Sequence, residues 1–276
     1  MKKLILTILA SSFLLSCSSD SSNDDSNNPE NGFLVKTVTN AHGTSSTTDV
    51  YSYNGNKING WVSSGGGNTT FTYDGDNIIN IQQSVSPNNT AISQWVDTTN
   101  YGYSNGLLIS SYQHFSQSTP QDFFNSTINS SYTYNSDGTR MENQTITLIG
   151  GAIYHISYKD YYSMGNRIKR EEYDADNSPM TLNSITTYTY DSKNLLYKNI
   201  TGISNLFIGQ VNNETGYTIK DNAGNIIETS QSIYQYNSQD YPISLIRTST
   251  RYTIDPQTGT STPNTPFTYT ENYTYY

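Results

Sequence analysis

The sequence predicts an all-β fold, an up-and-down antiparallel meander of about 16 to 18 strands that forms one domain over residues 33–276. Three observations predict it. Tyr supplies 25 of the 276 residues and Ser, Thr and Asn supply roughly two fifths, a composition that suits half-buried strands and their turns. Charged residues make up only 13%, which argues against a chain kept disordered by charge. One Tyr-rich hairpin pattern also recurs along most of the chain, and no stretch beyond the N-terminus has helical periodicity.

Residues 1–16 are predicted to be a secretory signal peptide. Lys2 and Lys3 precede an apolar stretch of about a dozen residues, which is too short for a stable membrane span. The last residues, Leu-Leu-Ser-Cys ending at Cys17, resemble the bacterial lipobox. That resemblance implies cleavage before Cys17 and acylation of its sulfur, which makes Cys17 a lipid anchor. The alternative is an ordinary signal peptide followed by a chance Cys.

Residues 17–32 are predicted to be a tether. From Ser18 to Gly32 there is no large apolar residue, so the segment cannot bury enough surface to order itself. Its acids Asp20, Asp24 and Asp25 resemble the acidic export signals of surface lipoproteins in the Bacteroidota. This resemblance implies an outer-membrane lipoprotein at the cell surface. The alternative is a solvated linker on a lipoprotein that faces the periplasm.

The charge and the Cys content exclude several classes of partner. Without Lys2 and Lys3 the chain has 12 basic and 23 acidic residues, a net charge of −11 that repels nucleic acid and anionic lipid head groups. A single Cys excludes a disulfide framework and an all-Cys metal site within one chain. We therefore expect a membrane partner through the lipid, a glycan or surface protein as ligand, and no nucleic acid, metal or cofactor. The sequence leaves the oligomeric state open.

Each repeat reads as a β-hairpin. An aromatic pair with one residue between is followed by Asn or Asp, a short polar turn and then an aliphatic residue, as in Tyr51 to Ile58. The alternation places both aromatics on one face of a strand, and the Asn-Gly or Asp-Gly turns accept the positive φ of tight hairpins. Further copies run through Phe71 to Ile78, Tyr101 to Leu107, Tyr132 to Met141, Ile156 to Ile168, Tyr188 to Leu195, Tyr217 to Ile226 and Tyr234 to Ile243, and Phe267 to Tyr269 is a half-copy.

Longer polar connections separate the copies. We expect short turns at one end of the meander and long loops at the other. A sheet of this length must close into a barrel, round or flattened in cross-section, or fold into a sandwich to remove its edges. The predicted long connections are Ser63 to Asn68, Ser86 to Thr90, Ser116 to Asn125, Asp174 to Pro179, Asn205 to Asn213 and Asp255 to Pro266.

The hairpin unit resembles the YD repeats of Rhs-type proteins, most clearly at Tyr132 to Met141 and Tyr217 to Ile226. The basic residue that often follows the Gly of that repeat is mostly missing, and the chain is too short for a toxin-enclosing shell. A nearer resemblance is to short Bacteroidota lipoproteins of unknown function that are described as having a porin-like fold. That resemblance implies a closed, many-stranded barrel and carries no activity.

An integral outer-membrane pore is the less favoured interpretation of such a barrel. A lipid-facing wall needs an unbroken apolar band, yet Arg170 and Glu172 lie beside Ile168. The C-terminal strand also lacks apolar residues at alternate positions before Tyr276. We therefore expect a porin-like barrel that is soluble apart from its lipid.

The sequence contains no catalytic motif, and we expect no enzymatic activity. The three His residues show no metal-binding spacing. The alternative is a glycan hydrolase that uses the acidic cluster Glu171, Glu172, Asp174 and Asp176, since glycosidases need two carboxylates flanking one bond. Glu171 and Glu172 are adjacent on a strand and are expected to point to opposite faces, so turn chemistry explains the cluster better.

Recognition of a glycan or protein is the function that we expect, alongside a purely structural role. The candidate ligand-contact residues are the two Trp residues, Trp61 and Trp95, and the Phe residues in or beside a long loop, Phe115, Phe123 and Phe124. The alternative is that these aromatics fill the interior of the shell.

Overall fold

The computed structural model describes residues 33–85, 94–118, 123–255 and 257–276, so the signal peptide, Cys17 and the tether lie outside the described residues. The described chain is an antiparallel meander with one short helix. Its elements are β1 (Val35–His42), β2 (Ser45–Asn54), β3 (Lys57–Ser63), β4 (Gly67–Asp74), β5 (Asn77–Val85), β6 (Gln94–Ser104), β7 (Leu107–Ser118), β8 (Phe123–Tyr134), β9 (Arg140–Thr147), β10 (Ile153–Ser163), β11 (Asn166–Asp174), β12 (Thr181–Tyr190), α1 (Ile203–Leu206), β13 (Glu214–Asp221), β14 (Ile226–Tyr236), β15 (Pro242–Ile254), β16 (Ser261–Pro263) and β17 (Phe267–Tyr275).

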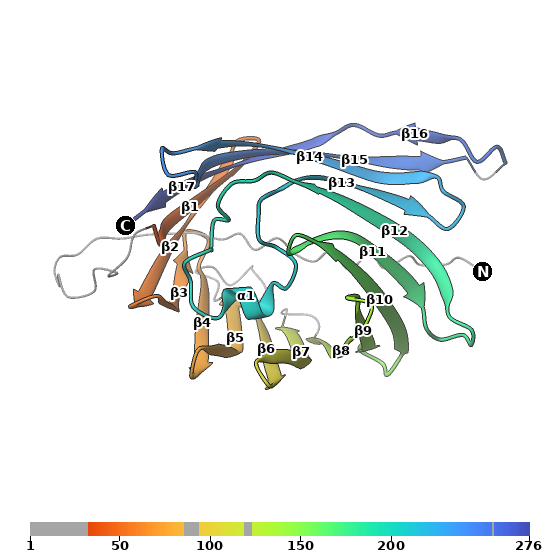
Figure 1. Ribbon diagram of the computed structural model, residues 1–276, viewed down its shortest axis with the longest axis horizontal. Coiled ribbons are helices and arrows are strands. Elements are labelled where there is room, and N and C mark those ends of the chain that lie inside the picture. The colour runs from red at the N-terminus through yellow and green to blue at the C-terminus, as the bar shows by residue number, and fades with distance from the viewer. Residues whose placement is uncertain (1–32, 86–93, 119–122, 256) are drawn as a thin grey trace.

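Sixteen of these strands close into a barrel (Figure 1). Each strand pairs with the next along the chain, and the ring closes because β1 pairs with both β2 and β17, while β17 pairs with β15. The short β16 pairs only with the far end of β15 and stands outside the ring. Closure removes the strand edges. The predicted meander is thus confirmed as a barrel and not a sandwich.

Alternate residues of each strand face the lumen and the outside. The buried core lies on the lumen side of one half of the barrel, and the paired aromatics of the repeat contribute to it, beginning with Tyr51 and Tyr53. Trp61 and Phe71 pack against this core from the neighbouring strands. The fully or nearly buried members of the core are Leu34, Val35, Val38, Tyr51, Tyr53, Ile58, Ile78, Ile200, Ile203, Leu245 and Tyr273.

Six Tyr hydroxyls join neighbouring strands at the end of the barrel where the tight turns lie, here called the turn end. Tyr103 near the end of β6 donates a hydrogen bond to the carbonyl oxygen of Ile78 near the start of β5, at 2.9 Å. We call this contact a tyrosine clasp. The same contact joins Tyr53 to Val35, Tyr134 to Leu108, Tyr190 to Arg167, Tyr234 to Glu214 and Tyr275 to Pro242.

A β-bulge lies beside three of these tyrosines, Tyr53, Tyr103 and Tyr190, and also beside Tyr73 and Tyr162. The register shifts immediately before each of these residues, and the extra residue is on the partner strand: Asn59, Ile79, Ile109, Ile168 or Thr215. The extra residue bends the partner strand. Tyr53, Tyr103 and Tyr190 keep the alternation of their own strands, so they remain on the lumen side and reach the neighbouring strand with their hydroxyls.

Residues 191–213, between β12 and β13, form a plug segment at the turn end. This differs from the predicted hairpin from Tyr188 to Leu195 and from the expectation of no helix, because the segment contains α1 and packs its apolar side chains inward. Tyr197 and Ile200 lie in the core, and the Tyr197 hydroxyl lies 3.1 Å from that of Tyr51. Burial of these side chains stabilises a conformation that the hairpin pattern does not anticipate.

The plug segment is hydrogen-bonded to turns on several sides of the barrel. The amide of Thr201 donates to the carbonyl of Asn56, and that of Asn194 donates to the carbonyl of Asp240. The amide of Arg167 donates to the carbonyl of Gly209. In Figure 1 the segment with α1 lies across the ends of β4, β5 and β6. The turn end is therefore crossed by backbone that is tied to opposite parts of the ring.

The outer wall of the barrel is largely polar. Hydroxyl pairs join neighbouring strands outside, as between Thr37 and Thr274 at 2.7 Å and between Thr248 and Thr268 at 2.9 Å. Exposed apolar residues are interspersed with these polar pairs. Val50 lies opposite Val62 and Ile233 opposite Ile246, and Leu107 and Ile109 of β7 are also exposed. The remaining outward-facing contacts include Thr39 with Thr48, Asn80 with Asn100 and Thr189 with Thr215.

Two predicted long loops are shorter than expected. The connection predicted from Ser63 to Asn68 is reduced because β3 ends at Ser63 and β4 begins at Gly67. The connection predicted from Ser116 to Asn125 is mostly strand, because β7 and β8 extend through residues 107–118 and 123–134. Ladder pairing continues there through Ser116, Gln117 and Ser118.

Candidate functional site

The candidate site lies on the lumen wall of β6 and β7, toward the end opposite the plug segment, here called the loop end. The register places Trp95 and Asp97 on the same face as Val85 and Gln83, which are buried. On the next strand Phe115 is directly opposite Asp97. Because Gln83 and Val85 belong to the lumen side, Trp95, Asp97 and Phe115 do too.

Two aromatic rings and one carboxylate meet at this position. The ring centroids of Trp95 and Phe115 are 6.1 Å apart and the planes are inclined by 34°. Between the two strands, Gln113 Nε2 donates to Asp97 Oδ2 at 2.7 Å. The other carboxylate oxygen, Oδ1, is buried and has no hydrogen-bond partner among the described residues. Burial raises the pKa of Asp97, and the hydrogen bond from Gln113 opposes that shift.

The five predicted contact residues are not brought together into one site. Trp61 packs in the core between Tyr51 and Phe71, with ring centroids at 5.1 and 5.4 Å. Trp95 and Phe115 lie together at the loop end. Phe123 and Phe124 are the first residues of β8, on a strand and not in a long loop, and their side chains lie outside the described part of the chain.

Asp97 and Gln113 complete the polar part of the site and are absent from the sequence-based candidates. A signal for them exists in the alternation, because Asp97 follows Trp95 by two residues and Gln113 precedes Phe115 by two. Residues two apart on a strand share a face. Applying this rule requires the strand boundaries, and the loop predicted from Ser116 to Asn125 ends the strand too early.

A second polar group in the lumen centres on Asp160 of β10, which is fully buried. Arg170 binds both of its oxygens, with Nε to Oδ1 at 2.7 Å and Nη2 to Oδ2 at 2.9 Å, and Arg140 Nη2 reaches Oδ2 at 2.9 Å. Arg170 also contacts Glu142 at 3.2 Å. Burial opposes ionisation of Asp160, but Arg170, with Arg167 and Arg140, outweighs it and lowers the pKa to about 2. A carboxylate that is ionised at neutral pH in this position holds three strands together and has no proton to donate there.

The acidic cluster proposed for hydrolysis is divided between two faces of the wall. Glu171 accepts hydrogen bonds from Tyr161 and Tyr173 and pairs with Lys169. Glu172 belongs to the opposite, lumen face, and burial raises its pKa. Asp174 Oδ1 accepts the backbone N–H of Asp176, a turn contact.

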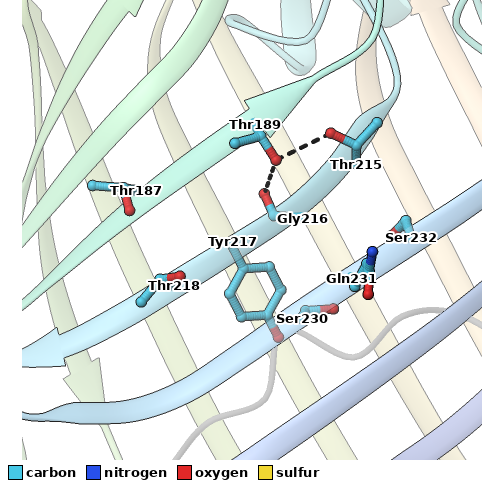
Figure 2. Close-up of a pocket in the computed structure, with 9 residues that line it drawn as sticks. All are labelled: Thr187, Thr189, Thr215, Gly216, Tyr217, Thr218, Ser230, Gln231 and Ser232. Carbon is cyan, nitrogen blue, oxygen red and sulfur yellow. Dashed lines mark hydrogen bonds between the residues drawn. The ribbon is translucent and has the colours of Figure 1, made fainter.

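The wall also carries a shallow polar cavity of about 440 Å³ where β12, β13 and β14 meet (Figure 2). Gly216 has no side chain and so leaves a gap between the neighbouring threonines. Thr189 Oγ1 donates a hydrogen bond to the carbonyl oxygen of Gly216 at a distance of 3.2 Å. A Cβ on Gly216 would lie 2.6 Å from the Ser230 carbonyl oxygen, so the gap cannot be filled without moving the wall. The lining is Thr187, Thr189, Thr215, Gly216, Tyr217, Thr218, Ser230, Gln231 and Ser232.

The described residues show neither a metal-binding cluster nor a membrane-spanning helix. Across residues 33–85, 94–118, 123–255 and 257–276, no group of three or more His, Cys, Asp or Glu side chains is placed to hold a metal ion. Within those same ranges, no helix has the length and hydropathy required to cross a bilayer.

Comparisons with known proteins identify the fold. No family model and no curated protein matches the sequence. A porin-like protein from Bacteroides vulgatus has a similar structure, with a TM-score of 0.54 at 14% identity over 88% of this chain and 98% of that one. A porin-like protein from Bacteroides uniformis aligns with a TM-score of 0.45 at 14% identity, over 88% and 96% of the two chains. The chain therefore has the closed, antiparallel barrel of porin-like proteins.

Proposed function

We propose that the protein is a lipid-anchored barrel of the cell envelope that stands outside the bilayer and binds a glycan or surface protein at its loop end, without enzymatic activity. The plug segment carries this proposal, because its backbone crosses the turn end, where an open channel would need a free passage. The polar outer wall supports it further. A barrel embedded in lipid needs an unbroken outward apolar band about 25 Å tall, and Thr–Thr pairs interrupt that face here.

The position of the tether supports an orientation. Phe33, the first described residue, stacks on Tyr241 at 4.9 Å, and its carbonyl accepts a hydrogen bond from Asn199 of the plug segment. The preceding residues therefore join the barrel at the plugged turn end. If Cys17 is acylated, the plugged end faces the membrane and the loop end, with Trp95, points away from it. We propose the outer membrane as the location, with the loop end toward the cell exterior.

Two measurements test the proposal. Labelled fatty acid should enter the wild-type chain and fail to enter the Cys17→Ala variant. The mature protein should give a reproducible signal on a glycan array or capture a surface protein. Label that enters independently of Cys17 would contradict the anchor. A flat array together with no captured protein would contradict the binding role.

A further inference from the structure

We propose that Trp95, Asp97, Gln113 and Phe115 form a subsite for a neutral pyranose sugar on the lumen wall. This inference rests on the proposed binding function and names its ligand class and its residues. Three properties of the cluster support it: an aromatic surface, an unpaired buried acceptor, and a charge that disfavours anions.

The aromatic surface comes from two neighbouring strands. Trp95 and Phe115 are both partly buried, and their rings lie side by side with centroids 6.1 Å apart. A pyranose presents an apolar face of C–H groups together with an equatorial rim of hydroxyls. Ligand sites combine such an aromatic surface with a few fixed polar groups. The Trp95 and Phe115 pair supplies the first and the Asp97 and Gln113 pair supplies the second.

The unpaired acceptor is Asp97 Oδ1. Its partner oxygen is fixed by Gln113 at 2.7 Å, so the carboxylate orientation is set before any ligand arrives. A buried acceptor without a donor is unfavourable, and a hydroxyl that donates to a carboxylate forms a charge-assisted hydrogen bond. Phe115 is directly opposite Asp97 in the ladder. A sugar hydroxyl that donates to Oδ1 lies beside the Phe115 ring and alters the surroundings of Trp95.

Charge selects among ligands. The chain carries a net charge of −9 and Asp97 adds local negative charge, so a carboxylate or phosphate is repelled. A cation is the main competitor, because aromatic rings and a carboxylate also attract ammonium groups. The Trp95 and Phe115 rings pack against each other instead of opening into a cage, and Gln113 already satisfies one oxygen. Both features favour a neutral sugar.

The fluorescence of Trp95 tests the subsite. Trp61→Phe in the mature chain leaves Trp95 as the only Trp, because the sequence has two. This protein is titrated with the methyl glycosides of glucose, galactose and mannose and with linear oligosaccharides of each. We expect a saturable change in Trp95 emission with at least one of them. Asp97→Asn should weaken that affinity about tenfold or more, since a charged acceptor becomes neutral.

Asp49→Asn is the matched control, because Asp49 is a buried lumen carboxylate that accepts a hydrogen bond from Ser63 on another part of the wall. It should leave the sugar affinity within about twofold. Circular dichroism verifies that each variant is folded. The subsite is overturned if no sugar changes Trp95 emission in the folded protein, if Asp97→Asn behaves like Asp49→Asn, or if choline chloride is active and the sugars are not. A positive glycan array with a silent Trp95 would overturn this subsite and leave the proposed function standing.

Discussion

The hydroxyl of Tyr103 lies 2.9 Å from the carbonyl oxygen of Ile78 and joins the end of β6 to the start of β5. The same clasp recurs around the turn end, so the aromatic repeat encodes contacts between strands as well as a buried face. Tyr103→Phe should lower the free energy of unfolding by about 1 kcal/mol, because one hydrogen bond is lost and the carbonyl of Ile78 is left without it. Tyr112→Phe, at an exposed Tyr on β7, should change it by less than about 0.5 kcal/mol. Equal effects of the two variants in urea unfolding would contradict the clasp.

The clasps also predict loss of stability in alkali. Burial and neighbouring tyrosines raise the pKa of the clasp residue Tyr103 to about 12, and burial raises to about 12 the pKa of Tyr73, which donates to the carbonyl of Thr201 in the plug segment. A raised pKa means that the folded state retains the proton, so this stability is complete below the unfolded value near 10 and is lost as the pH rises from about 10 to about 12. Unfolding followed by circular dichroism should show a steep loss over that interval. A free energy of unfolding that stays constant between pH 10 and 12 would contradict this expectation.

The Asp160 cluster should contribute strongly to stability. Asp160→Asn leaves Arg140 and Arg170 buried without their shared carboxylate, and we expect a loss of about 3–5 kcal/mol. Because the pKa of Asp160 is lowered to about 2, its contribution is present above about pH 4 and disappears as the pH falls toward 2. Asp76→Asn removes a surface pair with Lys57 and should change stability by no more than about 1 kcal/mol. The two variants should therefore separate clearly in denaturant unfolding at pH 7 and converge in acid.

A substitution at Gly202 tests whether the plug segment packs against the β4–β5 turn. The φ of Gly202 is +83°, and a Cβ there would lie 2.6 Å from the carbonyl oxygen of Asp76. Gly224 has φ +89° and open space around the same position, so Gly224→Ala reports backbone strain alone, about 1–2 kcal/mol. Gly202→Ala should cost at least about 1 kcal/mol more and should speed hydrogen exchange at residues 191–213. Matched exchange rates in the two variants would show that the plug segment is not held against the β4–β5 turn.

The sequence predicted the strands well because period-two alternation and Asn-Gly turns are local signals. It identified the Tyr51 and Tyr53 face, and it placed Glu171 and Glu172 on opposite faces. It missed the plug segment, since Tyr188 to Leu195 has the hairpin pattern while the burial of Tyr197 and Ile200 depends on strands far away in the chain. It identified Trp95 and Phe115 as candidate contact residues because they are aromatic. It missed Asp97 and Gln113, because their contact requires a register that only pairing of β6 with β7 defines.

The central claim is that this barrel stands in water on a lipid tether, and the fate of a chain without the lipid tests it most directly. The mature chain with Cys17→Ala, exported behind an ordinary cleavable signal peptide, is fractionated and its membranes are washed with carbonate. We predict that the variant leaves the membrane fraction and remains folded and monodisperse without detergent, whereas the wild type stays bound. Retention of the folded Cys17→Ala chain in washed membranes would contradict the account, because it would mean that the Thr-lined outer wall faces lipid.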